Sequence, residues 1–319
     1  LLKAMDEIHR ICEDSGIVYY LIGGSALGAV RHEGFIPWDV DIDIAMHRDD
    51  YDRFAEAAEK MLPKGLSYHN HKNTREYYRP HATVSIDNVC AVINSDYYRN
   101  AKTEPLFIDI FPLDNAPDDI TLQEKQAKEL KRIVKIHSRK ECVLYKRNTF
   151  VQIAIKRIIQ GALLPYSLDH LEKKRDSILT KYDAQDTKCW CSMVSHYPYS
   201  KQCMAKKIYG EPLKVKFNGR MYNAPHELDE YLTRIFGKNY MELPPVEKRV
   251  RPDDVIEMIR IDKKRHGLSY VELWFPNGEW KEIKCDMVRL HCLPEDENGN
   301  LELQHTLWTD LSKSEEELK

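Results

Sequence analysis

Acidic and aliphatic residues alternate in one short stretch of this chain, at residues 39–44. In a β-strand, side chains two positions apart point to the same face of the sheet. Asp39, Asp41 and Asp43 would therefore gather on one face, while the aliphatic side chains between them enter the core. Carboxylates held this close repel each other, and a divalent cation relieves the repulsion. The stretch predicts a strand with a metal-binding face; a solvated acidic edge strand is the alternative.

A glycine pair precedes the acidic stretch. Residues 17–22 are β-branched and aromatic, which is typical of a strand, and a short helix is predicted to begin at Ala26. Gly23, Gly24 and Ser25 lie between the two. Glycine lets the backbone approach a phosphate closely, and the amides at a helix start favour an anion. An ordinary turn is the alternative. The phosphate-binding interpretation is favoured because the glycine pair lies just before the carboxylates.

A third acid, Asp109, lies in the apolar run 106–111, which predicts another strand. Isoleucine flanks it on both sides, and a carboxylate in apolar surroundings is costly unless it is paired or bound to a metal. An Asp facing solvent at a strand end is the alternative. A glycine turn, an acid pair and a distant lone acid together form the layout of the nucleotidyltransferase fold, in which two metal ions can clamp the attacking and leaving oxygens.

The whole chain predicts an α+β protein with a nucleotidyltransferase-like core, in which helices flank a mixed sheet. The expected domains are a catalytic core at 1–120, a helical and mixed region at 121–265 that completes the acceptor side, and a β-hairpin appendage with a tail at 266–319. Pro276-Asn277-Gly278 between two strand-like runs is the strongest hairpin signal in the appendage. Within the core, residues 82–85 and 90–93 predict a pair of short strands around Asp87-Asn88.

Composition narrows the class of protein. The 319 residues carry a net charge of -3 and a pI near 6.5, which argues against a nucleic-acid partner. Eight scattered cysteines favour reduced thiols and a cytoplasmic location. No segment reaches the roughly 18–20 apolar residues of a membrane span. Residues 150–164 are apolar but carry Lys156 and Arg157, and a core helix is favoured there over a helix on a membrane surface.

Residues 20–44 resemble the signature of the LicD family, which includes bacterial phosphorylcholine transferases and is related to the fukutin-related ribitol-phosphate transferases. The runs 108–114, 217–222 and 240–245 are also similar to this family, and the resemblance covers about residues 5–251. Two departures are visible. Family members often have an acid where Val40 stands, and a His often follows the Pro-Pro block, where this chain has Arg249-Val250-Arg251-Pro252.

The resemblance implies a role for each acid. Asp41 and Asp43 would be metal ligands, and Asp109 would be a third ligand, the general base, or both. The expected cofactor is Mg²⁺, as two ions, with Mn²⁺ able to replace it. Asp39 would position the metal ligands without binding the metal itself. Its alternative role is to cap the start of the strand beside Trp38.

The resemblance also implies the residues that bind the donor. Gly23, Gly24 and Ser25 would cradle a diphosphate, and Arg31 and His32 would contact phosphate or substrate, unless they form an ordinary surface pair after the short helix. A choline group would need an aromatic cage. The candidates for that cage are Tyr77, Tyr78, Trp190, Tyr197 and Tyr199.

The activity implied by the resemblance is transfer of phosphocholine, or a similar phospho-alcohol, from CDP-choline or another CDP-alcohol to a hydroxyl of a cell-surface glycan, with release of CMP. Because family acceptors are often lipid-linked glycans, peripheral contact with the inner face of the cell membrane is a further expectation. Two other functions share the same residues. One is an NTP-using nucleotidyltransferase acting on a small-molecule or glycan acceptor, and the other is a non-enzymatic binding relic, against which the intact acids count.

Overall fold

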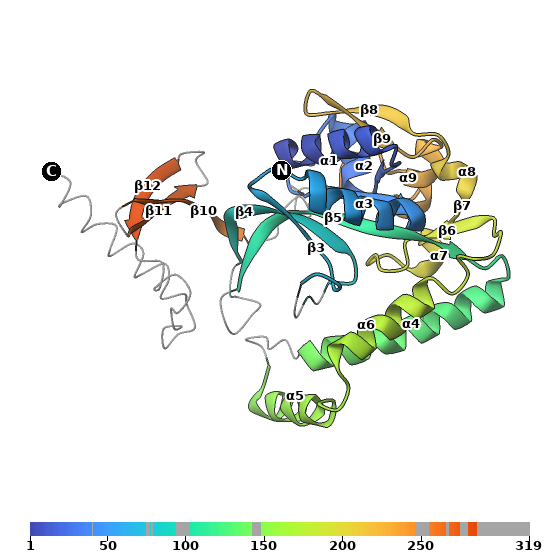
Figure 1. Cartoon of the computed structure of the whole chain (residues 1–319). Coiled ribbons are helices and arrows are strands. Elements are labelled where there is room, and N and C mark those ends of the chain that lie inside the picture. Colours follow the sequence, from blue (N-terminus) through green and yellow to red (C-terminus); the bar gives the residue numbers. More distant parts are fainter. Residues whose placement is uncertain are drawn as a thin grey trace. The chain divides into compact units, whose positions relative to one another are not determined.

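The computed structural model describes residues 1–39, 41–74, 77, 79–93, 102–141, 148–245, 255–265, 268–274 and 280–285. The chain divides into two compact units (Figure 1). The first unit contains Leu1–Ser85, Phe107–Cys142 and Lys156–Val250, and the second contains Ile86–Leu106, Val143–Ile155 and Arg251–Lys319. A mixed sheet with flanking helices confirms the predicted α+β class with a nucleotidyltransferase-like core. The predicted domain boundaries stay a prediction.

The sheet of the first unit is built around two parallel strands, β2 (Asp43–His47) and β5 (Lys102–Ala116). On one side of β2 lies the antiparallel β1 (Tyr20–Leu21); on the other side of β5 lies β4 (Ala82–Ile93), which also pairs with β3 (Leu66–His69). At the end of β5, the antiparallel strands β6 (Cys189–Cys191) and β7 (Cys203–Ala205) continue the pairing.

Strand β2 starts later than the acid alternation predicts. The alternation predicts a strand from Asp39 onward, but the described ladder begins at Asp43. Pro37 has no amide hydrogen to give to a ladder, and the amide of Asp39 instead donates to the carbonyl of Ile36 at 2.9 Å. Asp39 and Asp41 therefore lie in the segment that leads into the strand.

Three helices lie on one side of this sheet in Figure 1: α1 (Leu2–Ser15), α2 (Gly23–His32) and α3 (Arg48–Met61). Helix α1 ends at Gly16, whose left-handed φ of 60° suits glycine. Helix α2 begins at Gly23 rather than at the expected Ala26, so the glycine pair forms the first turn of the helix.

The remaining helices of the first unit follow β5. Helices α4 (Ile120–Glu141) and α6 (Leu168–Leu179) lie alongside each other, and α7 (Tyr199–Gln202), α8 (Lys206–Tyr209) and α9 (Leu228–Phe236) come later in the chain. A separate hairpin is formed by β8 (Leu213–Phe217) and β9 (Arg220–Ala224). Asn218 and Gly219 connect its strands with φ of 49° and 76°, the left-handed backbone that a two-residue hairpin turn requires.

Helix α5 (Phe150–Ala162) corrects the interpretation of residues 150–164 as a core helix. None of its residues is buried, although most of them are apolar. The sequence pattern identified the helix but not the surroundings of its apolar face. Among the residues that the structure describes, no helix is both long and apolar enough to cross a membrane.

The second unit is antiparallel where the structure gives its pairing. Strand β10 (Val255–Arg265) pairs with the Val89–Ile93 part of β4 and with β11 (Leu268–Trp274), which pairs with β12 (Trp280–Cys285). The predicted β11–β12 hairpin is thus confirmed. The predicted break at Asp87-Asn88 is wrong, because β4 is one continuous strand. Pairing with β10, far away in the sequence, outweighs the local turn preference of these two residues.

Candidate active site

Strands β2 and β5 bring two of the expected acids side by side. Asp43 is the register partner of Asp109, and the amide of Asp109 donates to the carbonyl of Ile42 at 3.1 Å. Register partners on neighbouring strands lie about 5 Å apart, with side chains on the same face. Ile42 and Ile44 are fully buried on the other face, as the alternation predicts. The central geometric expectation, that distant acids meet next to the glycine pair, is therefore met for these two residues.

The acids act on one another electrostatically. Burial, followed by the charges of Asp39 and Asp109, raises the pKa of Asp41 to about 7, although this side chain still reaches solvent. Burial, followed by the charges of Asp41, Asp109 and Asp39, raises the pKa of Asp43 well above its usual range. Asp39, Asp41 and Asp109 therefore lie close enough to Asp43 for their charges to disfavour its ionised form.

The start of α2 is bound to the acidic segment. The hydroxyl of Ser25 accepts from the amide of Asp43 at 2.8 Å and is 3.5 Å from the carbonyl oxygen of Asp41. A side chain on Gly24 would place its Cβ 2.5 Å from the Asp39 carboxylate. Glycine is therefore needed at position 24 for the helix and the acids to approach this closely.

Gly23 occupies the same junction. Its φ is 52°, a left-handed value, and a Cβ added here would lie 3.5 Å from a carboxylate oxygen of Asp43. Its amide donates to the hydroxyl of Tyr231, a buried residue of α9, at 2.9 Å. The turn that was expected to cradle a diphosphate thus borders the acids directly, and α9 fixes its first amide.

His81 is a site residue that sequence reasoning missed. Its Nε2 lies 2.7 Å from Oδ1 of Asp109, and its ring lies against Phe111, with centroids 4.2 Å apart. The only available signal was a histidine just before the predicted strand at 82–85. Its importance depends on β4 lying next to β5, and that strand order cannot be derived from periodicity.

Arg31 and His32 lie at the end of α2, away from its glycine start. The guanidinium of Arg31 donates to the carbonyls of Tyr240 and Glu242 at 3.0 and 3.3 Å. The ring of His32 packs edge-on against Trp38. Burial, followed by the charge of Arg31, lowers the pKa of His32. A direct phosphate contact for these two residues stays a prediction.

The runs that carried the family resemblance meet in space. Arg31, in the first run, holds the run at 240–245 through the carbonyls named above. The backbone amide of Asn218, in the run at 217–222, donates to the carbonyl of Glu33 at 2.7 Å, and the Asn218 side-chain oxygen accepts from the amide of Phe35 at 3.0 Å. Gly34 leaves room for Asn218, because a Cβ there would come 2.2 Å from the Asn218 side-chain oxygen. These later runs therefore brace the loop that leads to the acids.

The aromatic candidates separate into groups. Tyr197 lies near the acids, since burial and then the charges of Asp39, Asp43 and Asp41 raise its pKa to about 12. Tyr77 lies close to His81 and donates to its carbonyl at 2.9 Å. Tyr199 instead packs in a core cluster beside α4 and donates to Gln126. Tyr78 lies outside the described residues.

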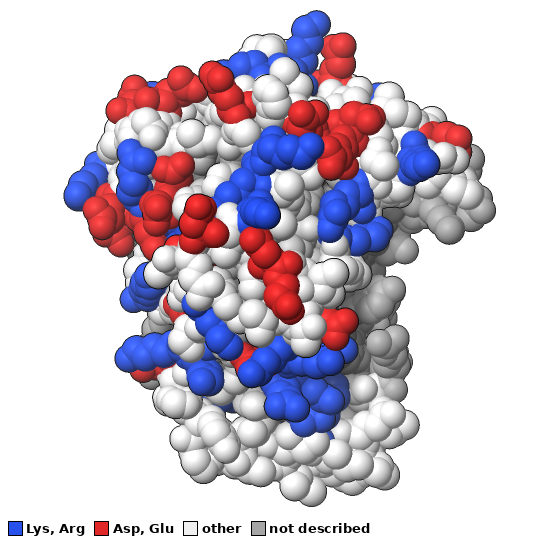
Figure 2. Space-filling view, turned by 90° about the vertical axis from the view of Figure 1, so that its right-hand side faces the viewer, with Lys and Arg blue, Asp and Glu red and all other residues white. Residues whose placement is uncertain are grey.

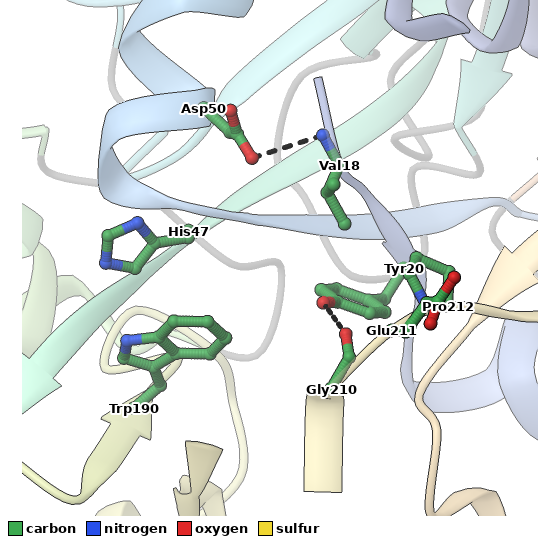
Figure 3. Close-up of a pocket in the computed structure, with 8 residues that line it drawn as sticks. All are labelled: Val18, Tyr20, His47, Asp50, Trp190, Gly210, Glu211 and Pro212. Carbon is green, nitrogen blue, oxygen red and sulfur yellow. Dashed lines mark hydrogen bonds between the residues drawn. The ribbon is translucent and has the colours of Figure 1, made fainter. Parts of the chain in front are cut away.

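Trp190 belongs to a different place, a cavity of about 300 Å³ at the other end of β2 (Figure 3). His47 and Trp190 form one wall, with ring centroids 4.6 Å apart, and Tyr20 lies across from them. His47 lies four positions after Asp43 along β2, a distance of about 13 Å. The cavity is therefore too far from the acids to hold a group attached to a phosphate that reacts there.

The donor set suits a hard cation such as Mg²⁺. Carboxylate oxygens are the ligands that this ion prefers, and the mutual repulsion of Asp41, Asp43 and Asp109 is what a cation would relieve. Within the described ranges, however, no three His, Cys, Asp or Glu side chains converge tightly enough to hold an ion. One oxygen of Asp109 is engaged by His81. The chemistry of the residues fits the ion, while their present side-chain positions do not form a closed site.

Comparison with known proteins places this geometry in a family. The description LicD/FKTN/FKRP, nucleotidyltransferase domain, matches residues 16–135, the segment that contains every acid discussed above and His81. Residues 16–135 are a LicD-family domain. The lipopolysaccharide cholinephosphotransferase LicD of Haemophilus influenzae is 29% identical over 249 residues, which cover 77% of this chain and 90% of that protein.

Two ribitol 5-phosphate transferases are similar to a shorter segment of this chain. The human and mouse ribitol 5-phosphate transferases FKRP are 43% identical over 53 residues, which cover 15% of this chain and 11% of those proteins. The similarity to the Haemophilus protein extends over most of both chains, whereas that to FKRP is short and local. The two departures noted in the sequence, at Val40 and at residues 249–252, lie outside the described residues.

Proposed function

We propose that this chain is a metal-dependent phosphotransferase that moves phosphocholine, or a similar phospho-alcohol, from a CDP-linked donor to a hydroxyl of a cell-surface glycan and releases CMP. The observation that carries the proposal is the parallel register of Asp43 and Asp109 beside the glycine start of α2. The similarity to a lipopolysaccharide cholinephosphotransferase over most of both chains supports the choice of transferred group and acceptor.

The acids would bind and neutralise the reacting phosphates through a cation. Asp41, Asp43 and Asp109 would hold Mg²⁺, which supplies positive charge to phosphate oxygens as negative charge develops there. The amides of Gly24 and Ser25, in the first turn of α2, would donate to the diphosphate, where the helix start favours an anion. Tyr197 would lie beside the alcohol end of the donor, where its ring can contact a quaternary ammonium.

Transfer would be a direct displacement at phosphorus. The glycan hydroxyl oxygen forms a bond to the phosphorus that carries the alcohol, and the bond from that phosphorus to the CMP oxygen breaks. Asp109 would take the proton of the attacking hydroxyl. His81, 2.7 Å from Asp109, would hold this carboxylate in position through the oxygen that it contacts.

A donor panel tests the proposal. The purified chain is incubated with Mg²⁺, a bacterial lipopolysaccharide acceptor and, in separate reactions, CDP-choline, CDP-ethanolamine, CDP-glycerol or CDP-ribitol, and CMP is quantified. We expect acceptor-dependent CMP release from one donor, and we expect its loss in the D41N/D43N variant. The variant should show the same circular dichroism spectrum as the wild type.

The same assay separates the alternatives. Release of pyrophosphate from an NTP, with no CMP from any CDP-alcohol, would overturn the proposal in favour of an NTP-using nucleotidyltransferase. A chain that releases neither product and shows no Mg²⁺-dependent thermal shift with cytidine nucleotides would match the non-enzymatic alternative. Full activity of D41N/D43N would remove the acids from the mechanism. A cytoplasmic location at the inner face of the membrane is part of the proposal, because the CDP-linked donor is a metabolite of the cytoplasm.

A further inference from the structure

Helix α5 presents its apolar residues outward. Val151, Ile155, Ile158 and Ala162 follow at intervals of four, three and four, which places them on one face of a helix. The exposed fractions of Phe150, Val151, Ile155 and Ile158 are 85, 65, 50 and 71%, and that of Leu164, just after the helix, is 73%. Surface helices normally turn such a stripe toward the core, and a large apolar patch left in solvent marks an interaction site.

The opposite face of α5 is the one that faces the protein. The side chain of Gln160 donates to the carbonyl of Lys140 at 3.0 Å, and the ammonium of Lys140 donates to the carbonyl of Leu163 at 3.2 Å. Ile153, Ile159 and Leu163 are partly covered, in contrast to the outward stripe. These polar contacts attach the C-terminal half of the helix to the end of α4 through the face opposite the stripe.

The surroundings of the stripe are basic. Residues 148–168 include no Asp or Glu, but they include Lys156 and Arg157. The last turns of α4 add further cations, and the exposed ones are Lys131, Arg132, Lys135 and Arg139. Figure 2 shows this pattern as an uncharged lower end of the molecule, where α5 lies, next to a band of Lys and Arg side chains.

Apolar side chains bordered by cations suit one kind of surface in particular. An anionic membrane offers acyl chains to the stripe and lipid phosphates to the cations. The 13 residues of α5 extend about 20 Å, which is shorter than the roughly 30 Å hydrocarbon core of a bilayer. The helix can therefore lie in the membrane interface but cannot cross the membrane.

We propose that α5 is a lipid-docking helix that places Val151, Ile155 and Ile158 in the interface of an anionic membrane, with Arg139 and Arg157 beside the lipid phosphates. The docking does not depend on the proposed phosphotransferase activity. If both hold, the helix brings the chain to the surface in which a lipid-linked acceptor is embedded.

Vesicle sedimentation tests the proposal with the full chain. We expect the wild type to pellet with vesicles of mixed phosphatidylcholine and phosphatidylglycerol, and to pellet at least about tenfold less with phosphatidylcholine alone, because several cations contribute. Added salt should weaken binding to the mixed vesicles. A wild type that stays in the supernatant with the mixed vesicles would overturn the proposal.

Two variants separate the apolar and the charged contributions. V151E/I158E should reduce binding to the mixed vesicles by about tenfold or more, because it places charges in the middle of the stripe. R139Q/R157Q should reduce binding to the mixed vesicles by about fivefold per residue. It should leave binding to phosphatidylcholine vesicles unchanged. The matched control is L213E, which adds a charge at a residue that is 45% exposed on β8 and should bind like the wild type.

Measurements on the chain without lipid test whether the variants fold normally and whether α5 mediates self-association. All of the substituted side chains are exposed or lie on exposed faces, so thermal unfolding should be unchanged. Sedimentation velocity without lipid should show the same species for the wild type and V151E/I158E. If the wild type self-associates and V151E/I158E does not, α5 is a contact between copies and the lipid proposal is wrong. The vesicle assay contains neither donor nor acceptor, so its failure cannot be confused with a failure to transfer.

Discussion

The two ends of the β2–β5 pair surround their acids in opposite ways. Toward the end of β5, Asp114 is fully buried, and Nε of Arg48 donates to its carboxylate at 2.6 Å. At the other end, the described groups that most affect Asp43 are other carboxylates. The fold itself supplies this buried acid with an opposite charge, although the second carboxylate oxygen of Asp114 has no hydrogen-bond partner among the described residues. A cation would compensate the charges of a cluster of acids that act mainly on each other, and this difference supports the second end as the proposed functional one.

The largest expected effect is on turnover, at the end with the clustered acids. D43N should lower CMP release by about a thousandfold or more, because an amide cannot supply the charge that binds the cation. Its thermal unfolding midpoint should stay the same or rise, since the substitution removes a repulsive charge. Turnover and thermal unfolding are measured on the same preparation. Wild-type turnover in D43N would break the comparison at its functional end.

The next effect is on stability, at the end with the ion pair. D114N should lower the free energy of unfolding by about 3–5 kcal/mol, because it leaves the Arg48 cation buried without its partner. Urea denaturation measures the change. The control is R48M/D114L, which removes both charges and should cost clearly less than D114N. If D114N unfolded like the wild type, the Asp114 end would not be the structural one.

A smaller effect is expected from the neighbour of Asp109. H81Q should lower turnover by about ten- to a hundredfold while the fold is retained, because Asp109 loses the group that orients it. The matched control is H69Q. His69 is also a half-buried histidine, but its ring contacts the hydroxyls of Ser85 and Thr74. Equal losses of activity in the two variants would show that His81 acts on the fold and not on the acid.

The smallest effect is a dependence of stability on pH and Mg²⁺. The folded-state pKa of Asp41 is about 7, and that of Asp43 is also raised from 3.8, so protons bind more tightly to the folded chain than to the unfolded one. Stability without metal should therefore fall as the pH rises from about 4 to about 7. Mg²⁺ should raise the unfolding midpoint by a few degrees at about pH 8 and by less at about pH 5, because its ligands must be deprotonated.

The D41N/D43N variant is the reference for that measurement. It should show a flatter dependence of the unfolding midpoint on pH and no Mg²⁺ shift at either pH. A shift of equal size in the variant would place the responsible Mg²⁺ site elsewhere on the chain.

Much of the site follows from local sequence. The alternation of residues 41–44 predicts which side chains enter the core, and the flanking isoleucines predict that Asp109 lies in a strand. Both hold because side-chain direction in a strand is set by covalent order. The pairing of Asp43 with Asp109 required the additional assumption of a nucleotidyltransferase-like sheet, since register between distant strands is not encoded by either strand alone.

Other features depend on contacts that a sequence pattern does not contain. His81 becomes a site residue only because β4 lies beside β5. The Asp87-Asn88 turn signal failed because β4 continues through these residues to Val89–Ile93, where it pairs with β10. In α5 the periodicity gave the helix correctly, yet the same pattern fits a stripe that faces the core or one that faces away.

The hydrogen bond from the amide of Gly23 to Tyr231 limits how far the protein can be truncated. Tyr231 lies well beyond residue 135, as do the carbonyls that hold Arg31 and the Asn218 side chain that accepts from Phe35. A fragment limited to residues 16–135 would retain every acid and still lack the supports of the glycine turn and its loop. The minimal working piece must therefore extend at least through Glu242.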